Sequence, residues 1–107
     1  MIHIDASVSL LGYKAWRESL APLEVGIIVE WVKPYSAFTV YDSISAGQRF
    51  LIKRVKGPSF GTSKLDADKV YEMVLVSKTG KEFKKKTCWS VENLARRIHL
   101  AEITIIN

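Results

Sequence analysis

Apolar and polar residues alternate through much of the second half of the chain, which is the pattern of half-buried β-strands. Residues 70–76 read VYEMVLV, and residues 78–89 read KTGKEFKKKTCW. Gly80 tolerates the positive φ of a tight turn, while Tyr, Val and Thr suit a pleated surface. We therefore predict a β-hairpin that turns at residues 79–80 and returns as a lysine-rich strand.

Further segments have strand-like patterns. They are residues 1–5, 25–32, 37–42, 48–56 and 102–106. Because Pro34 ends the second of these, we predict another hairpin that joins it to the third. The last segment is predicted to pair with residues 1–5 or with the central sheet.

Two segments have helical spacing. In the first, residues 7–20, Ser7 can act as an N-cap and Pro22 discourages continuation, although Gly12 weakens the helix. In the second, Ser90 is a suitable N-cap for an apolar stripe three and four residues apart. That stripe consists of Val91, Leu94, Ala95 and Ile98.

The order of these elements predicts a single domain over residues 1–107. No internal repeat or linker divides the 107 residues. Successive strands with short turns favour an α+β, β-rich fold with a small antiparallel sheet, or a half-open barrel of SH3-like or OB-like architecture. One or two helices are expected to pack on it.

Composition restricts the class of protein. A hydrophobic share of 48% and a charged share of 25% are typical of a globular domain. The single cysteine, Cys88, excludes an internal disulfide, and we find neither a secretory leader nor an apolar run of about 20 residues. We therefore expect a cytoplasmic protein without membrane contact.

Positive charge is concentrated in one half of the chain. The net charge is +5, yet acidic side chains outnumber basic ones in residues 1–47. All of the excess therefore lies in residues 48–107, which favours attraction to nucleic acid or to an acidic protein. The alternative is that these lysines only keep a β-rich protein soluble and protect its edges.

The return strand of the hairpin separates into two faces, because side chains alternate along a strand. Lys84 and Lys86 share one face with Glu82 and Cys88, about 7 Å apart, which matches the spacing of phosphates along a nucleic-acid strand. Two other basic clusters, in 53–56 and 96–97, could join this surface. The predicted nucleic-acid contacts are Lys53, Arg54, Lys56, Lys81, Lys84, Lys85, Lys86, Arg96 and Arg97.

Aromatic residues offer a further contact. Phe83 and Trp89 share the other face of the return strand with Lys85 and Thr87, where we predict that both rings belong to the core. If exposed, Trp89 could stack on a base or contact a partner. Phe60, in the turn-rich segment 57–63, is a second candidate for this role, or is packed on the core.

No pattern specifies a reaction. The triplet Glu82-Phe83-Lys84, preceded by Asp66, Asp68 and Glu18, resembles the order of the PD-(D/E)xK nucleases, which implies Mg²⁺-dependent cleavage. The aspartates lack the Pro-Asp context of that family. The first half of the chain also has an antiparallel pattern, whereas the core of that family contains parallel strands. His3 and His99 have no second ligand at metal spacing, and Cys88, expected to be inert, has no nearby histidine in sequence. We predict no metal, cofactor or catalytic residue.

Two functions follow from these patterns. The first is a small intracellular module that grips RNA or single-stranded DNA by its backbone through the basic hairpin. The alternative is an adaptor or inhibitor that docks on an acidic protein or adds a strand to its sheet. A Mg²⁺-dependent nuclease is the third and most remote alternative.

Overall fold

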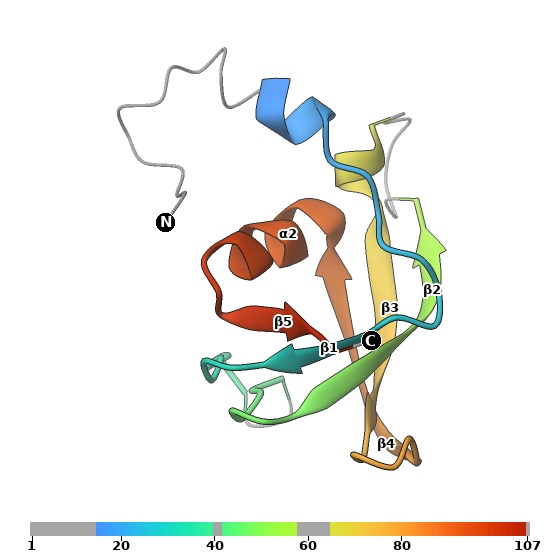
Figure 1. Cartoon of the computed structure of the whole chain (residues 1–107), viewed down its shortest axis with the longest axis vertical. Helices are drawn as coiled ribbons and strands as arrows, with labels where there is room; N and C mark the ends of the chain where they lie inside the picture. The colour runs from blue at the N-terminus through green and yellow to red at the C-terminus, as the bar shows by residue number, and fades with distance from the viewer. Residues whose placement is uncertain (1–14, 40–41, 58–64, 107) are drawn as a thin grey trace.

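The chain folds around an open, five-stranded antiparallel sheet with strand order β4-β3-β2-β1-β5 (Figure 1). The computed structural model describes residues 15–39, 42–57 and 65–106. The strands are β1 (Ile28–Trp31), β2 (Arg49–Lys56), β3 (Val70–Val76), β4 (Glu82–Ser90) and β5 (Ile103–Ile105). This confirms the prediction of a small β-rich α+β fold. Within these described residues the sheet does not close into a barrel, because β4 and β5 form its two edges.

Helices cover one side of the sheet. A 3₁₀ turn, η1 (Asp66–Asp68), precedes β3, and helix α2 (Val91–His99) follows β4 directly. Helix α2 contacts β4, β5 and η1, and Figure 1 shows it lying inside the curve of the sheet. Residues 15–18 are also helical, which agrees with the described part of the predicted helix 7–20.

The β3–β4 hairpin has the predicted strands and turn. Ser77 N donates to Lys81 O at 2.9 Å, and Gly80 N donates to Ser77 O at 2.9 Å. Gly80 adopts a φ of 92°, a conformation that side chains disfavour. The hairpin turn extends beyond the rest of the sheet, at the bottom of Figure 1.

Helix α2 begins where the sequence predicts. The Ser90 hydroxyl accepts a hydrogen bond from Asn93 N at 3.1 Å, which caps the first turn. Val91 and Leu94 are fully buried, and Ile98 packs against the core. The predicted apolar stripe therefore binds the helix to the inner face of the sheet.

The core is built from aromatic and branched residues on that inner face. Trp31 contacts Phe50 and Trp89 edge to face, with ring centroids 5.2 Å and 5.4 Å away. Ile52 and Tyr71 are buried beside them. Strand β2 contributes alternate residues to this core until a bulge between Ile52 and Arg54 turns its basic end outward.

The predicted strand 25–32 is shorter than expected. It begins at Ile28 instead of residue 25, because Gly26 has a φ of 98° and forms a turn with Val25. Val25 is accordingly exposed. Val29 and Trp31 are buried.

The predicted hairpin of residues 25–32 with 37–42 is wrong in the described residues. Residues 37–39 are not in a strand, and only an isolated bridge joins Tyr35 to Ile44. The Thr39 hydroxyl donates to the Asp42 carboxylate at 2.7 Å, which stabilises a turn. Strand β1 pairs instead with β2 and with β5, so the last predicted strand joins the central sheet. The predicted strand 1–5, residues 40–41 and the segment 58–63 with Phe60 lie outside the described residues.

Candidate nucleic-acid interface

Basic residues outside the hairpin turn and β4 all have carboxylate partners in the described part of the chain. Every lysine and arginine of residues 15–39, 42–57, 65–76 and 90–106 forms an ion pair. These pairs are Arg17 with Asp68 and Glu92, Lys33 with Glu102, Arg49 with Glu30, Lys53 with Glu82, Arg54 and Lys56 with Glu72, Lys69 with Asp66, Arg96 with Glu92, and Arg97 with Glu102. Their positive charge is therefore locally compensated.

The hairpin lysines differ from this pattern. Lys78, Lys81, Lys84 and Lys86 are exposed, and no carboxylate of the described residues pairs with them. Lys85 is partly buried, and its ammonium donates to the carbonyl oxygen of Ser43. We call these five residues the hairpin lysines. Uncompensated positive charge in the described chain is thus confined to one protruding hairpin.

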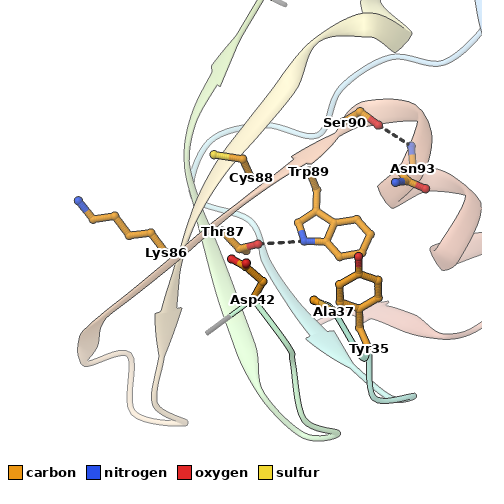
Figure 2. Close-up of a pocket in the computed structure, with 9 residues that line it drawn as sticks. All are labelled: Tyr35, Ala37, Asp42, Lys86, Thr87, Cys88, Trp89, Ser90 and Asn93. Carbon is orange, nitrogen blue, oxygen red and sulfur yellow. Dashed lines mark hydrogen bonds between the residues drawn. The ribbon is translucent and has the colours of Figure 1, made fainter. Parts of the chain in front are cut away.

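The predicted division of β4 into two faces is present at residues 86–89. Trp89 lies opposite Tyr71 and Thr87 opposite Met73, all on the core side. Lys86 lies opposite Val74 and Cys88 opposite Glu72, on the outer side. Figure 2 shows Lys86 and Cys88 directed away from Trp89 and Tyr35.

Two of the three predicted basic clusters meet on the outer face of the sheet. Strands β2 and β4 flank β3, and Lys53 Nζ of the bulge lies 3.0 Å from Glu82 of β4. Arg54 and Lys56 both contact Glu72 of β3, at 2.9 Å and 2.8 Å. The hydrogen bond from Lys56, together with the charge of Arg54, holds the pKa of the Glu72 carboxyl below its ordinary value. This face is positive but partly compensated by Glu72 and Glu82.

The third cluster does not join that face. Arg96 pairs with Glu92 along α2 at 3.0 Å. Arg97 pairs with Glu102 at 2.9 Å, and its guanidinium lies 5.0 Å from the centroids of the Tyr35 and Trp89 rings. Arg97 therefore covers the core aromatics, a packing role that the helical pattern does not reveal.

The aromatic candidates have different exposures. Trp89 is only 6% exposed, as predicted for a core residue, so little of its ring is available for stacking. Phe83, also predicted as core, is 45% exposed near the hairpin turn. Phe38 is fully exposed, and its position in a predicted strand concealed this.

A pocket of about 730 Å³ lies along β4, where this edge strand leaves the sheet open (Figure 2). Its walls come from β4, from the first turn of α2 and from the segment around the Tyr35–Ile44 bridge. The residues that line it are Tyr35, Ala37, Asp42, Lys86, Thr87, Cys88, Trp89, Ser90 and Asn93. Sequence patterns did not predict this pocket, because it depends on segments distant in the chain.

The acidic residues of the nuclease-like pattern are not gathered. Glu82 lies opposite Val76, at the far end of β3 from η1 with Asp66 and Asp68. Glu82 pairs with Lys53, and the η1 carboxylates pair with Lys69 and Arg17. Within the described ranges, no group of three or more His, Cys, Asp and Glu residues could hold a metal ion. Cys88, expected to be inert core, is exposed as a free thiol.

Comparisons with known protein families, with curated proteins and with solved structures find no match for this chain. In the part of the chain described by the structure, no helix has the length and apolar character needed to cross a membrane.

Proposed function

We propose that this protein is a small nucleic-acid-binding module that grips the backbone of RNA or single-stranded DNA through its hairpin lysines. The observation that carries the proposal is the contrast in charge compensation. Described cations outside the hairpin turn and β4 are paired with carboxylates, whereas the hairpin lysines are not. An anionic ligand can therefore approach this hairpin without displacing a carboxylate of the described residues.

The arrangement of these lysines suits a phosphate chain. Lys84 and Lys86 both lie in β4 and are two residues apart, so their Cα atoms are separated by about 7 Å. Successive phosphates of a single strand are spaced on a similar scale, and each contact releases counterions. Lys81 extends the same surface toward the turn, while Lys53, Arg54 and Lys56 add positive potential beside it.

Charge reversal in the hairpin tests the proposal. We expect Lys84→Glu with Lys86→Glu to abolish binding to single-stranded RNA or DNA in a low-salt gel-shift assay. The matched control is Lys33→Glu with Lys69→Glu, which changes the net charge equally at two ion-paired lysines outside the hairpin. The control should retain most of the affinity. An equal loss of affinity in both variants would show that binding depends only on net charge and would contradict the proposal. Unchanged binding in the hairpin variant would refute it.

A protein-interaction module is the second candidate, because β4 is an edge strand that pairs only with β3 among the described elements. A partner with an acidic surface could add a strand there. Such a contact should depend less steeply on salt than nucleic-acid binding does, since aromatic anchors such as the exposed Phe83 would contribute. An intracellular, reducing compartment fits either function, because Cys88 is a free exposed thiol.

A further inference from the structure

We propose that the pocket along β4 receives an unpaired nucleobase that carries an exocyclic amino group, from the same strand whose phosphates lie on the hairpin lysines. This inference rests on the proposed function and deepens it by assigning a base-binding site. Lys86 connects the two sites, because it lines the pocket and is also one of the hairpin lysines. Its side chain points to the outer face of the sheet, away from Trp89 and Tyr35 (Figure 2).

The pocket is open to solvent and large enough to receive a nucleobase. Its volume of about 730 Å³ falls in the usual range of about 300–1,000 Å³ for ligand pockets. Tyr35 and Trp89 form an aromatic wall, with ring centroids 4.9 Å apart in an edge-to-face arrangement. Arg97 lies over both rings and pairs with Glu102, so this wall is held in place by α2 and the residues after it.

Polar groups in the pocket have unused hydrogen-bonding capacity. The Asp42 carboxylate accepts one side-chain hydrogen bond, from Thr39 to Oδ2, which leaves Oδ1 available. Within the described chain, no partner engages the side-chain amide of Asn93 or the hydroxyl of Tyr35. The Thr87 hydroxyl oxygen accepts from Trp89 Nε1 at 3.1 Å and can still donate its own proton. The pocket therefore offers both donors and acceptors.

The carboxylate determines the kind of base. A carboxylate oxygen only accepts, so it selects a ligand that brings N–H donors, as when Asp or Glu accepts from the amino group of cytosine. Uracil and thymine have no exocyclic amino group. Their ring N3–H can donate one hydrogen bond, but the carbonyl oxygens on both sides of it would face the carboxylate unfavourably. The Asn93 amide can donate to a ring nitrogen or carbonyl oxygen beside the amino group. We therefore expect bases with an exocyclic amino group, which are cytosine, adenine and guanine, to be preferred over uracil.

The test compares single-stranded oligonucleotides of equal length made of cytidine, adenosine or uridine. Wild type should bind the cytidine or adenosine oligomer about tenfold more tightly than the uridine oligomer. Asp42→Asn should remove this preference, because the amide can keep the Thr39 contact but presents a donor. Glu24→Gln, at an exposed carboxylate outside the pocket, is the matched charge control and should keep the preference.

A second variant and a spectroscopic readout separate the pocket from the lysines. Asn93→Ala should weaken the preference without disturbing α2, because the Ser90 cap uses the backbone N–H of Asn93. Free cytidine, but not uridine, should shift the NMR signal of the Trp89 indole N–H, whose acceptor Thr87 lines the pocket. Equal wild-type affinity for all oligomers, or a preference that survives Asp42→Asn, would overturn the inference while leaving backbone binding intact. Failure of the hairpin charge reversal would instead refute the proposed function.

Discussion

Arg97 and Lys86 carry the same formal charge in opposite surroundings. Arg97 pairs with Glu102 and covers the Tyr35 and Trp89 rings, so its charge is compensated within the protein. Lys86 is exposed, and no described carboxylate pairs with it. At the scale of single residues, a cation that pairs with a carboxylate is less available to a ligand than a cation that does not. Sequence spacing predicted both as contacts and could not distinguish them.

Tyr71 gives a prediction about pH. Its hydroxyl accepts a hydrogen bond from Leu23 N at 2.6 Å, and burial raises the pKa of the phenol above its ordinary value near 10. The folded state therefore favours the neutral phenol, whose contribution to stability is complete below about pH 10 and is lost as the pH rises through the folded pKa.

The measurement is the urea midpoint of wild type and Tyr71→Phe at neutral and at strongly alkaline pH. The difference in stability between the two proteins should shrink or reverse at high pH, because only wild type loses this contribution. Every other titratable group is present in both proteins, so the variant itself is the control. A difference that does not change with pH would contradict this assignment.

The β3–β4 hairpin shows how local signals specify an element. Its strands pair from Val70 with Ser90 to Val76 with Glu82, and an irregularity near the turn places two extra residues in β4. Gly80 closes the turn at positive φ, and Ser77 accepts at its hydroxyl from the backbone N–H of Lys81 at 3.0 Å. The turn therefore sets the register in which β4 returns along β3.

Substitution of Gly80 tests the role of the turn. Gly80→Ala should lower the free energy of unfolding by about 1–2 kcal/mol, because the left-handed conformation disfavours a Cβ. An added Cβ would meet nothing within 4 Å, so the cost is conformational and not steric crowding. Gly57→Ala, which also has open space but no positive φ, should be close to neutral or stabilising. Equal effects in urea unfolding would contradict this explanation.

At the scale of the whole molecule, the open sheet creates the candidate site. Among the described strands, β4 and β5 form the two edges, and the pocket beside β4 is lined by α2 and by Tyr35, Ala37 and Asp42. The sequence predicted α2, β2 and the hairpin, because caps, turn residues and alternation act over short distances. The predicted strand at residues 37–42 was wrong, because an alternating pattern does not reveal whether a partner strand is present. Phe38, which the pattern placed in that strand, is exposed.

The candidate site, like the fold, was predictable from the sequence only where its pattern is local. Alternation in β4 identified the lysine face, because that pattern is local. The pairing of Lys53 with Glu82 depends on a bulge in β2, and the pocket depends on Asp42, Asn93 and β4 meeting in three dimensions. Such contacts between distant residues leave no periodic signal in one sequence.

The most direct test of the central claim is the salt dependence of affinity for a single-stranded oligonucleotide. A plot of the logarithm of the binding constant against that of the salt concentration should be linear and steep for wild type. Lys84→Gln with Lys86→Gln should reduce the slope by about 1.4, which is about 0.7 for each lost phosphate contact. Lys33→Gln with Lys69→Gln should leave it nearly unchanged. A shallow wild-type slope, or one unaffected by loss of the hairpin charges, would contradict nucleic-acid binding by this hairpin.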